Sequence, residues 1–117
     1  MVEAPIQGMQ QEQNMQLQVH GQGVDVGDRL RDFVERRCNE GLQHFDERLT
    51  RVEVHLRDLN GQKGGVDKRC TCEARPRGLD PIAVEHDSTE ITEAVQGAIG
   101  KLQRALQSRF DKRDAHR

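Results

Sequence analysis

The stretch RVEVHLR, residues 51–57, alternates apolar and polar side chains without interruption. This period of two predicts a β-strand with one face in a core and the other in water. Similar alternation at residues 16–20 and 67–75, and the apolar pair Ile82 and Val84, predict three further strands. Residues 28–45 and 90–113 instead place apolar side chains at helical spacing, which predicts two amphipathic helices.

The predicted order is β-α-β-β-β-α, an α+β fold. The first two strands straddle a helix, which favours parallel pairing, and the last three strands follow as an antiparallel meander. Each strand has one polar face and each helix one apolar stripe, so we expect a four-stranded mixed sheet with two helices packed on one face. Glycine- and proline-containing turns at residues 58–66 and 76–81 join the later strands, and Asp87 or Ser88 is expected to cap the last helix.

The length of 117 residues fits one domain. We place it at residues 15–113, because residues 1–14 are rich in Gln and predict a disordered tail. Residues 114–117 are expected to be a disordered C-terminus. The sequence has neither an apolar run of about 18 residues nor a secretory signal, which favours a cytoplasmic protein without membrane contact. We expect a monomer.

Positive charge is concentrated at the C-terminal end, although the net charge is -2. Residues 101–117 hold six of the 18 Lys and Arg but only two of the 20 Asp and Glu. On the last helix, Lys101, Arg104 and Lys112 form a stripe about 100° around from the apolar stripe that ends at Leu106. Such a stripe is either a solvated surface or a contact for a polyanion. The candidate phosphate-binding residues are Arg36, Arg37, Lys101, Arg104, Arg109, Lys112 and Arg113.

Other chemistry-bearing residues have simpler interpretations. Phe33 and Phe45 are expected to be the largest core side chains, and Cys38, Cys70 and Cys72 fall on apolar faces as small core residues. His20 and His55 could be neighbours on the open sheet face, with Glu53, Glu73 or Glu85 nearby, and could bind a metal or move protons. No nucleophile, phosphate loop or recognisable ligand spacing accompanies them, so we assign no catalytic residue, cofactor, small-molecule substrate or metal. The open face also lacks the aromatic side chains on which single-stranded RNA stacks, and cross-strand charge pairing explains it.

Several segments resemble the ribosome hibernation-promoting factor / RaiA family, also called sigma-54 modulation proteins. They are MQLQVHG at 15–21, LRDFV at 30–34, Phe45-Asp46 and KLQRAL at 101–106, in an order and spacing that span residues 15–113. The resemblance implies a short bacterial member that binds 16S rRNA of the small ribosomal subunit, where tRNA and mRNA would sit, and silences idle ribosomes under stress. It implies rRNA contacts from basic residues of both helices, and Arg37, Lys101, Arg104, Arg109 and Lys112 match basic or His positions of the family pattern.

The sequence departs from the family pattern at a few positions. Glu40 and Ser108 stand where well-studied members carry Lys, Phe110 replaces a basic residue, and Thr92 replaces a usual Tyr. Each missing cation removes a phosphate contact. Two alternatives therefore stand beside ribosome binding: a protein-interaction module of the same fold, and a general binder of structured RNA.

Overall fold

The computed structural model describes residues 15–59 and 66–115. The elements are the strand β1 (Gln16–Gln22), the helix α2 (Asp28–Leu42), the short 3-10 helix η1 (Gln43–Arg48), the strands β2 (Leu49–Asp58), β3 (Lys68–Pro76) and β4 (Ile82–Ser88), and the helix α3 (Ile91–Ala115). The predicted α+β fold with the order β-α-β-β-β-α is confirmed. The predicted tail at 1–14, the centre of the predicted loop at 60–65 and residues 116–117 lie outside the described residues.

The four strands form one sheet in the order β1-β2-β3-β4. β1 pairs with β2 in parallel, and the other two pairs are antiparallel, as the sequence predicts. The parallel register sets Val19 opposite Val54 and His20 opposite His55. Because successive side chains of a strand point to opposite faces, the two valines are buried while the two histidines lie on the open face.

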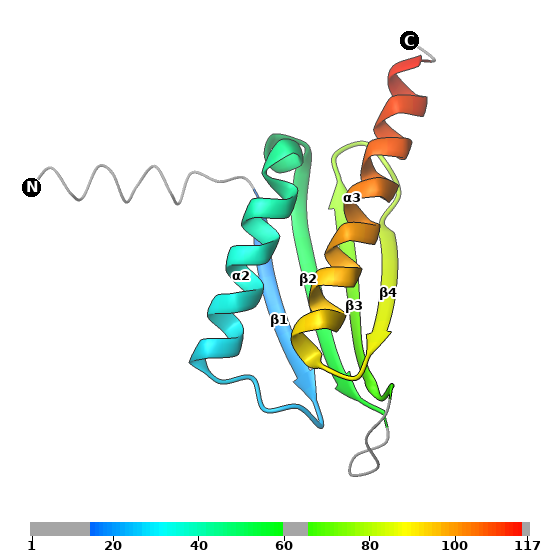
Figure 1. Cartoon of the computed structure of the whole chain (residues 1–117). Helices are drawn as coiled ribbons and strands as arrows, with labels where there is room; N and C mark the ends of the chain where they lie inside the picture. The colour runs from blue at the N-terminus through cyan, green and yellow to red at the C-terminus, as the bar shows by residue number, and fades with distance from the viewer. Residues whose placement is uncertain (1–14, 60–65, 116–117) are drawn as a thin grey trace, which may run out of the picture.

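Both helices lie on the same face of this sheet, with α2 over β1 and α3 over β3 and β4 (Figure 1). The apolar positions of RVEVHLR point toward them and are fully buried. The core therefore forms between the helical layer and the sheet, as the alternation predicts. Its fully buried side chains include Val34 and Leu42 of α2, Val52, Val54 and Leu56 of β2, and Leu102 and Leu106 of α3.

Phe110 is a core residue and is not part of the exposed side of the last helix. Its side chain is 1% exposed, and its ring stacks on Phe45 with 5.8 Å between centroids. The prediction that the apolar stripe of the last helix stops at Leu106 is therefore wrong. The predicted role of Phe33 as a main core residue is also corrected, because Phe33 is only partly buried at the edge of the core.

The first helix ends earlier than the sequence predicts. The α-helix stops at Leu42, and a 3-10 turn replaces its predicted continuation to Phe45. A 3-10 helix has three residues per turn, so Phe45 follows Leu42 on the same side, and both are buried. At the other end of the chain, α3 continues to Ala115, which places Asp114 and Ala115 in the helix rather than in the predicted disordered terminus.

All three cysteines are buried as free thiols, as predicted for small core residues. Cys70 and Cys72 are alternate residues of β3, and their Sγ atoms are 3.9 Å apart. Burial raises the pKa of the Cys38 thiol to about 12. A thiol in this environment stays protonated, which makes it a poor nucleophile and a poor metal ligand.

Candidate nucleic-acid interface

α3 carries most of the predicted phosphate-binding residues, and the sequence before it fixes where it begins. Ser88 Oγ accepts a hydrogen bond of 3.5 Å from the Glu90 amide and donates one of 2.8 Å to Glu93 Oε1. Ser88 thus serves the helix start, as one of the two predicted caps, whereas Asp87 is bound to Arg69 on the sheet. The helix that follows carries five Lys or Arg against three Asp or Glu.

Two of these cations fold back onto the sheet edge. Lys101 Nζ donates a hydrogen bond of 2.9 Å to the carbonyl oxygen of Glu85 in β4. Arg113 Nη1 donates one of 3.0 Å to the carbonyl of Arg77, in the turn between β3 and β4. Both side chains remain exposed, so they present positive charge along this side of α3 from fixed positions.

The remaining predicted cations of α3 are accessible to solvent. Arg104, Arg109 and Lys112 are exposed. Within residues 15–59 and 66–115, Arg104 and Arg109 have no ion-pair partner. Their guanidinium groups are therefore available to an external anion without breaking an internal contact.

The predicted residues of α2 divide into one that faces α3 and one that does not. Arg37 ion-pairs with Glu40 at 3.1 Å and lies over the Phe33 ring at 5.6 Å from the centroid. It lines a hollow between the two helices, whereas Arg36 is exposed outside that hollow. The predicted side-by-side arrangement thus brings Arg37, but not Arg36, to the boundary with α3.

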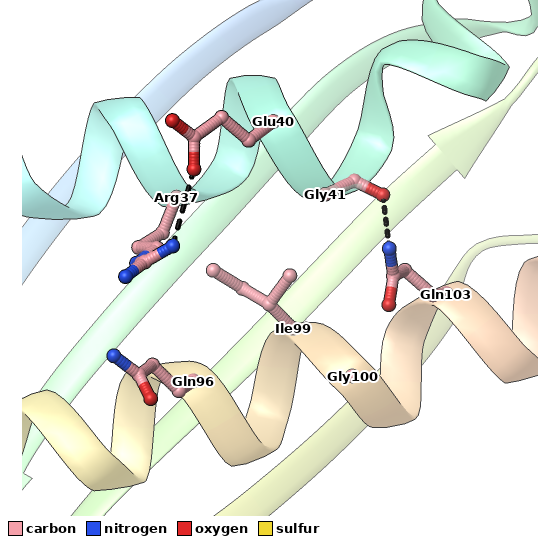
Figure 2. A pocket seen from close by; sticks show the side chains of 7 residues that line it. All are labelled: Arg37, Glu40, Gly41, Gln96, Ile99, Gly100 and Gln103. Atoms are coloured by element: carbon pink, nitrogen blue, oxygen red, sulfur yellow. Dashed lines mark hydrogen bonds and ion pairs between the residues drawn. The ribbon is translucent and has the colours of Figure 1, made fainter.

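A groove runs between α2 and α3 (Figure 2). One end has a volume of about 300 Å³ and is lined by Arg37, Glu40, Gly41, Gln96, Ile99, Gly100 and Gln103. The adjoining end, of about 330 Å³, adds Arg104, Gln107 and the η1 side chains Gln43, His44 and Phe45.

Gly41 lets the helices approach closely along this groove. A Cβ atom at Gly41 would lie 2.7 Å from Ile99 Cγ2, and Gln103 Nε2 donates a hydrogen bond of 2.6 Å to the Gly41 carbonyl. The groove floor is therefore a fixed contact between the two helices. Arg37 lines one end of the groove and Arg104 the other. The helical spacing in the sequence did not predict that either residue lines a groove.

Two cations that the sequence analysis missed extend the basic surface near the end of α3. The Arg48 guanidinium lies 3.7 Å from the centroid of the Phe110 ring and 3.4 Å from Asp114 Oδ1. Arg77 is exposed, and its Nε donates a hydrogen bond of 3.1 Å to the Glu47 carbonyl. Arg48 ends the short helix η1 and Arg77 lies in the turn after β3. No periodic pattern of the sequence assigns either residue to a face, so only the folded chain places them beside α3.

The open face of the sheet carries ion pairs, but within the described part of the chain the predicted cross-strand pairing of opposite charges holds only between β3 and β4. Between β2 and β3 the register sets like charges opposite each other, as at Arg51 and Arg75, and the ion pairs form within each strand. Arg69 donates two hydrogen bonds to Asp87, of 2.8 and 3.0 Å, across the β3–β4 pair. These bonds hold the pKa of the Asp87 carboxyl below its usual range. On β2, Arg51 ion-pairs with Glu53 at 2.8 Å. Several charged side chains of this face thus have an ion-pair partner among the described residues, whereas Arg104 and Arg109 of α3 have none.

The arrangement on the helical face suits phosphate groups. Arg and Lys bind phosphate oxygens through charge-assisted hydrogen bonds, and they need no complementary aromatic surface to do so. In the described helices Phe45 and Phe110 are buried, and the partly buried Phe33, 5.6 Å from the Arg37 guanidinium, is the one Phe ring with accessible surface beside these cations. None of the described helices has the length and apolar character to cross a bilayer.

Comparison with known proteins assigns the family. The family model for "Sigma 54 modulation protein / S30EA ribosomal protein" matches residues 17–114. The chain belongs to this family. The family predicted from the sequence segments is thereby confirmed, and the match takes in the four strands and α3 except for the first residue of β1 and the last residue of α3. The curated protein sequences gave no match.

Two solved structures share the fold. A ribosomal subunit interface protein from Coxiella burnetii superposes with a TM-score of 0.72 at 21% identity, covering 83% of this chain and 99% of that one. The N-terminal domain of Thermus thermophilus Protein Y superposes with a TM-score of 0.65 at 19% identity, covering 78% of this chain and 93% of that one. At these identities the similarity shows a common fold.

Proposed function

We propose that the protein binds the small ribosomal subunit through the helical side of the molecule and inhibits translation by steric occupancy. The observation that carries the proposal is the family match over residues 17–114. One structure with the same fold is itself described as a ribosomal subunit interface protein. The proposed ligand is 16S rRNA, the proposed role is the silencing of idle ribosomes under stress in the bacterial cytoplasm, and no catalytic step is involved.

The proposed contact surface is the cationic face, defined as Arg36, Arg37, Lys101, Arg104, Arg109, Lys112 and Arg113. Its members are exposed point charges on two rigid helices, which fits recognition of a folded RNA by shape and phosphate position. Arg104 and Arg109 should contribute most, because they have no competing ion pair among the described residues. Arg37 should contribute less, since Glu40 already neutralises part of its charge.

Charge reversal at Arg104 and Arg109 tests the surface. The double variant Arg104→Glu plus Arg109→Glu should lose most of its co-sedimentation with purified small subunits at moderate salt. In a salt series, removal of each phosphate-binding cation should reduce the slope of log affinity against log salt by about 0.7–0.9. Both residues are exposed and off the buried side of α3, so the thermal unfolding midpoint should change little.

The matched control is Arg57→Glu plus Arg75→Glu, which changes the net charge equally on the open sheet face. Both of these residues are exposed on strands that the helices do not cover on this side. The control should retain wild-type binding. Equal losses in both double variants would show only a general charge effect and would refute the assignment of the cationic face.

The second candidate function is a protein-interaction module of the same fold. The interhelical groove favours it, because most of its polar lining is amide side chains and the Arg37–Glu40 pair rather than unpaired cations. Absence of any binding to small subunits at low salt would reject ribosome binding and leave this alternative. Equal affinity for small subunits and for an unrelated RNA duplex would instead indicate a general binder of structured RNA.

A further inference from the structure

We propose that His20, Glu53 and His55 form a binding site for one divalent transition-metal ion on the open face of the sheet. The three side chains are brought together by the parallel β1–β2 pair, which sets His20 directly beside His55. Glu53 lies two residues before His55 on β2 and so points to the same face. The open face is the side of the sheet that neither α2 nor α3 covers (Figure 1), so the site is separate from the cationic face and does not depend on ribosome binding.

The spacing of the ligand atoms suits a metal ion. His55 Nε2 and Glu53 Oε1 are 3.2 Å apart, and one ligand atom from each of the three residues lies within 4.8 Å of the others. A tetrahedral Zn²⁺ with bonds of about 2.0–2.1 Å holds neighbouring ligand atoms about 3.3 Å apart. The His55–Glu53 pair already has this separation, and His20 needs to approach by at most about 1.5 Å.

His20 is the ligand that must move, and its side chain is free to do so. His20 is exposed on β1, an edge strand, so its side chain can change rotamer without displacing the core. Its ring already lies against His55, with 4.9 Å between centroids and 19° between planes. His55 Nε2 already faces the Glu53 carboxylate, so the change that the site requires is a rotation of the His20 ring.

Glu53 is oriented for a single metal bond by its second oxygen. Arg51 Nη2 lies 2.8 Å from Glu53 Oε2 and donates a hydrogen bond of 3.0 Å to Gln18 Oε1. The carboxylate is therefore held from one side, while Oε1 is left toward His55. Outer partners of this kind fix ligand orientation in metal sites. Because the ion pair with Arg51 occupies Oε2, coordination of the metal by Oε1 alone is favoured.

The donor set indicates which ions fit. Two imidazoles and one carboxylate are a three-ligand set used for zinc with an open fourth position, and imidazole equally suits Cu²⁺ and Ni²⁺. The open position has room, because a hollow of about 490 Å³ adjoins the cluster and is lined partly by His20, His55, Arg57 and Thr71. A water molecule or a small anion can occupy it. The buried thiols are on the other face of the sheet and do not compete in the folded protein.

The test uses the full chain without an affinity tag. Titration with ZnCl₂ by calorimetry should give one site per chain, and CoCl₂ should give d–d absorption of a low-coordinate ion without thiolate charge transfer. His20→Gln, His55→Gln and Glu53→Gln should each weaken zinc binding at least about 10-fold. The matched control is His44→Gln, an exposed histidine of η1 outside the cluster, which should bind as wild type.

A second measurement on the wild-type protein does not depend on any variant. In two-dimensional NMR spectra of the histidine rings, zinc should shift the signals of His20 and His55 and leave those of His44 and His86 in place. The proposal is overturned by zinc binding that survives loss of His20, by cobalt spectra with thiolate bands, or by no binding at millimolar zinc.

Discussion

Phe110 packs the last turns of α3 against the 3-10 helix η1, and the stability cost of its truncation can be estimated. The side chain is 1% exposed, stacks on Phe45 and is covered by the Arg48 guanidinium. A buried Phe→Ala change costs about 3–5 kcal/mol, which includes the cavity it leaves. The site is near a helix end that can partly collapse, so we expect Phe110→Ala to lower the free energy of unfolding by about 3 kcal/mol.

The measurement is urea unfolding followed by circular dichroism, with Ser108→Ala as the matched control. Ser108 is exposed on the same turn of α3, so its truncation should change stability by less than about 0.5 kcal/mol. The denaturant slope should be unchanged in both variants, because neither alters the surface exposed on unfolding by much. A loss below about 1 kcal/mol for Phe110→Ala would refute the assignment of Phe110 to the core.

A third variant separates a core role from a contact role. Phe110→Arg restores the basic residue that the family pattern carries, but it places a charge where the ring is buried. We expect it to be more destabilising than Phe110→Ala, since burial of an unpaired charge adds to the loss of packing. A stable Phe110→Arg protein that binds small subunits more tightly would show that this position is part of the ribosome contact.

Three further outcomes are expected. Asp87→Asn should lower the free energy of unfolding by at most about 1 kcal/mol at neutral pH. Arg69 lowers the pKa of Asp87 in the folded protein, so this stabilisation is present above the unfolded carboxyl pKa of about 3.9 and is lost as pH falls through the folded pKa. The thermal midpoints of wild type and variant should therefore converge in acid. Gly97→Ala should fail to give the usual helix gain of about 1 kcal/mol, because its Cβ overlaps the His86 ring, and His86→Ala should restore that gain in a double-mutant cycle. Cys38 and the other two thiols should resist alkylation in the native protein and react fully in denaturant, as followed by mass spectrometry.

The sequence predicted the fold because its strands and helices differ in period. Alternation at residues 51–57 and 67–75 requires that one face of these strands is buried. A sheet with both helices packed on that face buries the apolar sides of the strands and of the helices together. Phe110 follows Leu106 by four residues, the same step that joins Leu102 to Leu106, so the helical spacing does place it on the buried side. It was missed because the comparison with the family pattern treated this position as one for a basic residue.

The candidate site could be predicted only in part. Exposure of Arg104 and Arg109 follows from their places on α3, and the Arg37–Glu40 pair follows from i,i+3 spacing. The bonds of Lys101 to the Glu85 carbonyl and of Arg113 to the Arg77 carbonyl join distant parts of the chain. Those bonds depend on how the helix sits over the sheet, which no local pattern specifies.

The strands lie in the sheet in the same order as in the sequence, and this order has a consequence for folding kinetics. β2, β3 and β4 can pair as successive neighbours, whereas β1 reaches β2 only after the chain has passed through α2 and η1. Closing that longer loop costs more entropy, so the meander should form before β1 attaches. In partly opened molecules β1 should detach first, and its amides should exchange with deuterium faster than those of β3. While attached, β1 covers the edge of β2, whose uninterrupted alternation would otherwise offer a template for pairing with a second chain.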